Sequence, residues 1–311
     1  MSDVILDRRD LSFQLFEVLD TDALFQRPRF AEHSRETIEA ALDTAEKLAR
    51  EKFANHNSLA DKNEPTFVDG KVAMLGEVKT AFDAYINAGF LSSRASFEEG
   101  GMQLPEIAAA ACKGMFTCVN PSSTAYAFLT AAAANVIRNF ASDTLKSQFL
   151  EPMMAGRFTG TMALTEPHAG SSLADIRTRA VPQEDGSYRL KGNKIYISGG
   201  DNELADNIVH LVLAKIPGGP EGVKGISLFV VPKYRLDAQG NPGERNDVVL
   251  AGLIHKLGYR GTTSTALTFG DNDDCHGYLV GEAHQGLRYM FQMMNEARVG
   301  VGFGAAVLGY R

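Results

Sequence analysis

The chain has 311 residues, of which 44% are hydrophobic, and its formal net charge is −7. This length exceeds one usual domain, so we expect two, with enough apolar residues to build their cores. The negative charge argues against a nucleic-acid-binding surface, and three cysteines without a CxxC pair favour a reducing compartment over a disulfide framework. The charged N-terminus and the lack of a long apolar run predict no secretory signal, no membrane span and a cytoplasmic location.

Residues 1–155 have the pattern of helices and predict an N-terminal all-α domain. Apolar residues recur at helical spacing between residues 30 and 53, with charged residues on the other face. Further helices are predicted over 76–91, 105–117 and 122–139, and Ser142 is a candidate N-cap for a short helix after them. The polar stretch 55–70 predicts a loop.

The pattern changes near Phe158 to short β-rich runs separated by clusters of Gly, Pro, Asn and Asp. These runs predict an antiparallel middle β-domain, sandwich-like or barrel-like, over 156–280. The predicted strands are 158–165, 176–181, 188–190, 194–198, 208–214, 226–231, 248–257 and 263–269.

The final segment, 285–311, is helical again, and its apolar residues alternate at spacings of three and four. Such a seam predicts lengthwise packing against other helices, which the chain does not supply. We therefore expect residues 281–311 to begin a helical domain that is largely missing, so that the chain is a fragment. The predicted fold class is α+β. The seam consists of Leu287, Met290, Met294, Ala297, Val301, Gly304 and Leu308.

Two segments predict ligand-binding loops at strand ends. The sequence MALTEPHAGSS covers residues 162–172, and KGNKIYISGG covers residues 191–200. A strand that ends in a Gly/Ser turn exposes backbone N–H groups and hydroxyls, which suit a polar, flat or phosphorylated ligand. On their chemistry alone, two ordinary hairpin loops remain the commoner explanation.

Four segments together resemble the acyl-CoA dehydrogenase family in order and spacing: LTEPHAGSSLADIRT, KGNKIYISGG, HKLGYRGTTSTALTFGD and GLRYMFQMMNEARVGVGFGAAVLG. The resemblance covers nearly the whole chain. The opening segment, residues 6–20, is similar to that of a longer bacterial subgroup. The implied activity is FAD-dependent α,β-dehydrogenation of an acyl-CoA thioester, either 3-methylmercaptopropionyl-CoA or a fatty acyl-CoA.

The resemblance also implies roles for particular residues. Positions along the flavin match Met162, Leu164, Thr165, Tyr196 and Ser198. Positions that contact the acyl-CoA substrate match Ser171, Asn295 and Arg298. His168 stands where many members have glycine, and it is given no role.

None of the glutamates matches the family's catalytic base, and Glu166 matches a turn residue. The resemblance therefore implies a dehydrogenase that is inactive as this fragment, and no catalytic residue is assigned within the chain. It further implies an electron acceptor such as an electron-transfer flavoprotein and a homo-oligomeric full-length protein.

The histidines and the acidic stretch 271–274 lack the spacing of metal ligands, so no metal site is expected. The alternative function is that of a flavin-containing, DNA-associated stress-response protein of the same superfamily.

Overall fold

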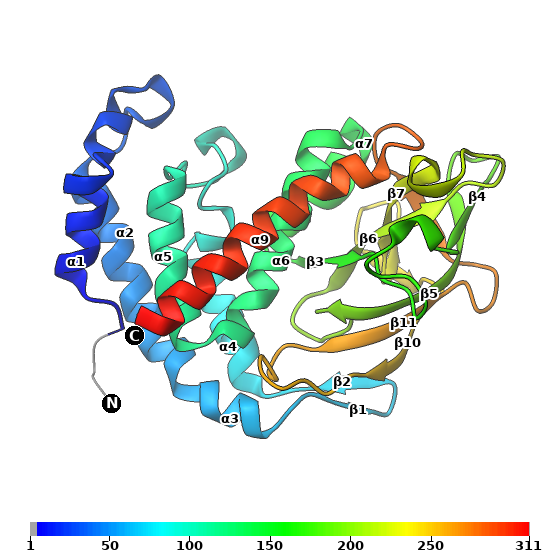
Figure 1. The fold of residues 1–311 in the computed structure, drawn as a ribbon, viewed down its shortest axis with the longest axis horizontal. Helices are drawn as coiled ribbons and strands as arrows, with labels where there is room; N and C mark the ends of the chain where they lie inside the picture. Colours follow the sequence, from blue (N-terminus) through cyan, green and yellow to red (C-terminus); the bar gives the residue numbers. More distant parts are fainter. Residues whose placement is uncertain (1–4, 311) are drawn as a thin grey trace. The chain divides into compact units, whose positions relative to one another are not determined.

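The computed structural model describes residues 5–310 (Figure 1). The chain divides into two compact units. The first, called here the helical unit, comprises the chain up to Lys62, Leu75–Thr124 and the stretch from Arg298. The second, called here the β-unit, comprises Asn63–Met74 and Ala125–Ala297. Each unit is thus built from separated stretches of chain, and the predicted domain limits at 155 and 280 stay predictions.

The helical unit contains three helices in predicted ranges, α2 (Arg35–Leu48), α4 (Gly76–Asn87) and α5 (Glu106–Val119). It also contains two short helices that were not predicted, α1 (Arg8–Ser12) and α3 (Asn57–Lys62), and α3 lies inside the predicted loop over 55–70. Short π- and 3-10-helical turns connect them: η1 (Phe13–Val18), η2 (Thr21–Gln26), η3 (Pro28–Phe30), η4 (Ala49–Phe53), η5 (Ala54–His56), η6 (Phe90–Ser92) and η7 (Phe97–Glu99). Helix α2 begins after a capping box at Ser34, which fixes its start inside the predicted range.

Aromatic residues form the centre of the helical unit. The Phe116 ring lies 5.0 Å from Phe53 and 4.9 Å from Tyr85 between centroids, and both pairs meet edge to face. Phe90 packs on the same ring at 5.2 Å. These contacts join α4, α5 and the turns beside them, because each of the four rings comes from a different segment.

A small hairpin interrupts the helical half of the sequence and corrects the predicted loop over 55–70. Strands β1 (Thr66–Val68) and β2 (Lys71–Ala73) pair antiparallel around Asp69-Gly70, whose φ angles are +50° and +78°. An Asp-Gly pair between short strands is a strong signal for a tight hairpin turn, and it was available in the sequence. The hairpin belongs to the β-unit, where β1 lies beside β10 (Val248–Leu253) (Figure 1).

The β-unit is a mixed sheet with helices. Its strands run in the order β10-β11-β5-β12-β7-β6-β3, and β4 pairs with both β5 and β6. Their bounds are β3 (Phe158–Ala163), β4 (Arg179–Pro182), β5 (Tyr188–Ser198), β6 (Asn207–Lys215), β7 (Ile226–Pro232), β11 (Ser264–Phe269) and β12 (His276–Leu279). A separate two-stranded sheet contains β8 (Tyr234–Leu236) and β9 (Pro242–Arg245).

Two features differ from the predicted antiparallel domain. Strand β3 pairs with β6 in parallel, and β4 also meets β6 in parallel, whereas the other neighbours are antiparallel. The two runs predicted at 188–190 and 194–198 form one continuous strand, β5, because Gly192 adopts a φ of +159° and lets the chain stay extended past Thr178. The helices of this unit include α6 (Pro121–Phe140), which begins in the helical unit, α7 (Asp143–Leu145), η8 (Lys146–Leu150), α8 (Glu151–Met154), η9 (Leu173–Asp175), η10 (Gly222–Gly225) and the first part of α9 (Gly286–Tyr310).

Strands β6 and β7 form the middle layer of the β-unit. Along β6, Val209 and Leu211 pack with residues of α6 and α9 (Gly286–Tyr310), whereas Val212 packs with β5, β10 and β11. Alternate side chains of a strand point to opposite faces, so both faces of β6 are covered. This explains why β6 reads as a continuous apolar run.

Helix α9 occupies most of the final segment, as predicted, and residues from Arg298 onward belong to the helical unit. Met290 is fully buried, but Val301 is 65% exposed and Leu308 is 40% exposed. The predicted seam is therefore covered at its start and open toward its end. Among residues 5–310, no helix is long and apolar enough to cross a bilayer.

Candidate functional site

The structure brings the two predicted flavin-binding segments together at one corner of the β-unit. The backbone N–H of Ile195 donates to the carbonyl of Thr165 at 2.9 Å, which joins the end of β3 to the last third of β5. The Lys194 ammonium donates to the carbonyl of Leu164 at 2.8 Å. Residues about thirty positions apart in sequence are thus adjacent in space.

Tyr196 lies at a β-bulge in β5. The register against β11 shifts between Thr265 and Leu267, and Tyr196 takes a left-handed φ of +61°. In an unbroken strand residue 196 would share the buried face of Lys194, but the bulge turns its ring outward, where it is 63% exposed. A left-handed backbone conformation costs a residue other than glycine of order 1 kcal/mol relative to ordinary strand geometry. Strain of this kind, together with an exposed aromatic ring, is typical of binding sites.

The turn after β5 is firmly held. Gly199 donates to the carbonyl of Thr263 at 3.0 Å, and its φ of +67° favours glycine. Thr263 in turn donates its N–H to the hydroxyl of Tyr126 on α6 at 2.9 Å. A Cβ on Gly199 would lie 3.5 Å from the Tyr126 ring, so this helix backs the turn directly. Ser198, exposed on the strand just before it, is therefore displayed by a rigid support.

The remaining flavin-site predictions differ in what they can offer. The side chain of Leu164 is buried, so it contributes only backbone, and its carbonyl already accepts from Lys194. Met162 and Thr165 are half-buried. The Thr165 methyl faces Gly170, where a Cβ would approach it to 3.2 Å. Among these predicted residues, Thr165, Tyr196 and Ser198 thus have side chains that are not buried.

The loop between β3 and β4 is organised around the carboxylate of Glu166, whose side chain is only 3% exposed. Its Oε1 accepts from the Thr178 hydroxyl at 2.6 Å and from the Thr178 N–H at 3.0 Å, and its Oε2 accepts from the Arg177 N–H at 2.7 Å. Oε1 also forms a 2.9 Å ion pair with Lys194, whose side chain is fully buried. The turn prediction for Glu166 leaves out this ion pair, and no role is predicted for Lys194. Lys194 lies four residues after Leu190, on the same face of the extended strand, and this spacing is the sequence signal that could have indicated a buried lysine in need of a partner.

Electrostatics agree with this arrangement. Burial raises the pKa of Glu166, but Lys194 and the bonds from Thr178 and Arg177 outweigh burial, so its pKa is lowered. Burial lowers the pKa of Lys194 to about 8, although Glu166 opposes the shift. His168 is exposed, with Nε2 3.1 Å from the Asp175 carbonyl and 3.7 Å from Glu166 Oε2, and it has no evident chemical role.

The predicted substrate-binding residues lie on two elements. Ser171 is exposed in the loop after β3. Asn295 and Arg298 are both exposed on α9 and, being three residues apart, lie on the same side of the helix. Their roles in substrate binding stay predictions. Among residues 5–310, no group of three His, Cys, Asp or Glu side chains could hold a metal ion.

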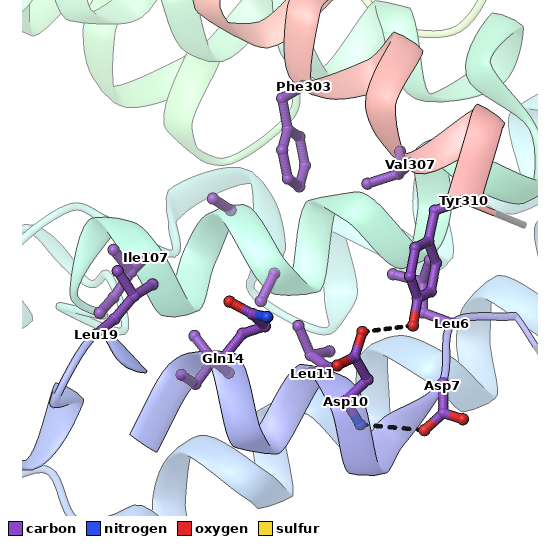
Figure 2. Close-up of a pocket in the computed structure, with 13 residues that line it drawn as sticks. Leu6, Asp7, Asp10, Leu11, Gln14, Leu19, Ile107, Phe303, Val307 and Tyr310 are labelled. Carbon is purple, nitrogen blue, oxygen red and sulfur yellow. Dashed lines mark hydrogen bonds between the residues drawn. The ribbon is translucent and has the colours of Figure 1, made fainter. Parts of the chain in front are cut away.

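A separate apolar pocket of about 330 Å³ lies in the helical unit (Figure 2). Side chains of α1, η1, α5 and the end of α9 line it, including Leu11, Ile107 and Phe303. At its edge the Tyr310 hydroxyl donates to Asp10 at 2.6 Å. No predicted site residue contributes to this pocket.

Comparison with known proteins agrees with the fold and the motifs. Residues 161–272 match the family model described as the middle domain of acyl-CoA dehydrogenase. The 3-methylmercaptopropionyl-CoA dehydrogenase of Ruegeria pomeroyi is 37% identical over 97% of this chain and 51% of its own length. A butyryl-CoA dehydrogenase of Syntrophomonas wolfei is 36% identical over 94% of this chain and 50% of its own length.

The fold matches solved structures at lower sequence identity. The crystal structure of an acyl-CoA dehydrogenase complexed with FAD from Bacillus anthracis aligns with a TM-score of 0.71 and 22% identity, over 89% of this chain and 42% of that one. The chain spans about half the length of the curated relatives it matches. Motifs, architecture and relatives agree: residues 161–272 match the middle domain of the acyl-CoA dehydrogenase family, and the chain as a whole is similar to members of that family.

Proposed function

We propose that this chain supplies the flavin-binding surface, and part of the acyl-CoA-binding surface, of an FAD-dependent acyl-CoA dehydrogenase. The reaction would convert 3-methylmercaptopropionyl-CoA or a fatty acyl-CoA to its 2-enoyl-CoA. The observation that carries the proposal is the bond between Ile195 and Thr165, which gathers the residues that resemble the family's flavin positions at one corner of the sheet. The relatives named above are described as dehydrogenases of acyl-CoA thioesters, which supports this choice over the DNA-associated alternative.

The residues at this corner fit a flavin. A flat ring with a polar edge needs an aromatic or apolar wall and hydrogen-bonding partners beside it. Tyr196 offers an exposed ring, and Thr165 and Ser198 offer hydroxyls as polar partners. When bound, FAD would supply hydride acceptance from the substrate's β-carbon.

Removal of the α-proton requires a carboxylate that is free to accept it. Glu166 is the carboxylate of the β3–β4 loop, but its oxygens accept from Arg177, Thr178 and Lys194, and its pKa is lowered. It is therefore committed to holding the loop. We propose that the base lies outside residues 1–311, so that this chain alone does not complete the reaction.

The flavin assignment is tested by the double substitution Thr165→Ala and Ser198→Ala. Two hydroxyl bonds at about 0.5–1.5 kcal/mol each would be lost, so FAD affinity should fall by roughly 5-fold to 150-fold. Titration of the apoprotein with FAD, followed by flavin fluorescence, measures the change. Thr144→Ala, which removes an exposed hydroxyl on α7, is the control. Unchanged affinity in the double variant would overturn the assignment.

The catalytic proposal is tested by anaerobic addition of saturated acyl-CoAs to the FAD-loaded 311-residue chain. Loss of a general base alone costs about 100-fold to 10,000-fold, so bleaching of the flavin absorbance should be absent or very slow. Bleaching as fast as in a full-length relative would show that a carboxylate of this chain serves as the base. An electron-transfer flavoprotein as acceptor, a homo-oligomer and a cytoplasmic location stay predictions.

A further inference from the structure

The Glu166–Lys194 pair ties together the two segments of the proposed flavin corner. Lys194 Nζ reaches the loop carboxylate at 2.9 Å and the Leu164 carbonyl at 2.8 Å. The next residue, Ile195, binds the Thr165 carbonyl through its backbone. Three consecutive residues of the first segment are thus held by two consecutive residues of β5, immediately before the bulge at Tyr196.

We propose that the Glu166–Lys194 ion pair is the positioning element of the flavin site, which fixes the Leu164–Thr165 backbone next to the Tyr196 bulge and keeps the net charge beside that backbone neutral. The inference rests on the proposed binding of FAD. Neither residue is assigned contact with substrate or cofactor; both act through the backbone that they hold.

Burial is what gives the pair this role. Both side chains are almost completely shielded, at 0% and 3% exposure, so neither charge can be screened by water. A buried pair that accepts and donates several bonds rigidifies its surroundings, whereas loss of one partner leaves the other charge uncompensated. An uncompensated charge near a flavin changes how readily the ring accepts electrons: a positive charge favours the reduced form and a negative charge disfavours it.

The test uses the FAD-loaded protein and three variants: Glu166→Gln, Lys194→Met and the double variant Glu166→Gln/Lys194→Met. We expect each single variant to weaken FAD binding about tenfold or more through loss of the positioned backbone. We also expect flavin reduction potentials to move in opposite directions. The potential should rise in E166Q measured at pH 6, which favours the protonated form of Lys194, and fall in K194M measured at pH 8, which favours the ionised form of Glu166, each relative to the wild type at the same pH. The double variant should return toward the wild-type potential.

Control variants with the same changes in charge come from a more exposed ion pair, which lies beside the other end of β5. Arg235 pairs with Asp274, which also lies 3.5 Å from Arg189 on β5. Arg189 is seven residues before Tyr196, or roughly 23 Å along an extended strand at about 3.3 Å per residue. Asp274→Asn and Arg235→Gln make the same changes in charge, and they should leave both FAD affinity and potential unchanged.

The outcomes separate the inference from the proposed function. If the wild-type protein fails to retain FAD, the proposed function fails and this inference falls with it. If the wild type binds FAD but E166Q and K194M keep its affinity and potential, only the inference is overturned. Potential shifts of the same sign in both variants would show a general structural effect and would also overturn it. Lys194→Arg keeps a cation and donors at this position, so FAD binding within threefold of wild type supports the inference if K194M fails to fold.

Discussion

His210 should make the stability of the β-unit depend on pH. It lies fully buried in β6, with Nδ1 2.8 Å from the Thr161 hydroxyl, and its Nε2 has no hydrogen-bond partner among the described residues. Burial, and secondarily the charge of Lys233, lowers the pKa of His210 from 6.5 to about 3. The folded protein therefore holds this imidazole neutral where an unfolded chain would protonate it.

The sign and size follow from linkage between proton binding and folding. Because the folded-state pKa is depressed, the contribution to stability is complete above pH 6.5 and is lost as the pH falls toward 3. The difference between the two pKa values, 6.5 − 3, corresponds to at most about 4.8 kcal/mol at about 1.36 kcal/mol per pH unit. At pH 5, about 1.5 units below the unfolded-state value, the loss should be about 2 kcal/mol.

The assay compares urea unfolding of the wild type and His210→Gln at pH 7 and pH 5. Other titrating groups are common to both proteins, so the difference between their pH effects isolates His210. The wild type should lose about 2 kcal/mol more than the variant between these pH values. Equal losses would refute the reasoning, and so would an NMR signal of His210 that titrates near pH 6.5 in the folded protein.

Two further substitutions test the packing and charge of the β-unit by unfolding measurements. Lys194→Met should destabilise the protein by about 3–5 kcal/mol, because it leaves the buried Glu166 carboxylate unpaired. Adding Glu166→Gln should recover part of this loss. A loss in Lys194→Met as small as that of a surface substitution would contradict the reasoning. Gly160→Val should cost about 1–3 kcal/mol or more, since a Cβ there would lie 2.6 Å from Ala133 and from Met153. The control is Gly252→Ala in β10, where a Cβ would meet nothing within 4 Å. If Gly160→Val were as stable as Gly252→Ala, β3 would be able to move away from α6, and the prediction would be wrong.

The sequence predicted most elements because their periodicity is local. Helices α4, α5 and α6 and strands β3, β6, β7 and β11 lie within or close to their predicted ranges, since each depends on apolar spacing over a few turns or a few alternations. Ser142 caps α7 as expected, accepting from the Leu145 N–H at 3.3 Å. The resemblance implied flavin positions on two separate segments, and the folded chain brings these segments into contact.

The tertiary structure decided what depends on distant residues. Periodicity cannot show that β3 and β6 run parallel, because strand direction is set by the connection between them. Nor can it show that the hairpin at 66–73 joins the β-unit, or that Val301 and Leu308 remain exposed on α9. These depend on which surfaces are left for burial once the larger elements have packed.

At the candidate site the division is equally clear. Resemblance at the level of sequence indicated Thr165, Tyr196 and Ser198 as chemical groups on two segments. Only the folded chain shows the bulge that turns Tyr196 outward and the Glu166–Lys194 pair that joins the two segments. The physical reason is that a bulge arises from register against a neighbouring strand, and a buried ion pair arises from burial of both partners, and neither is a property of a short stretch of sequence.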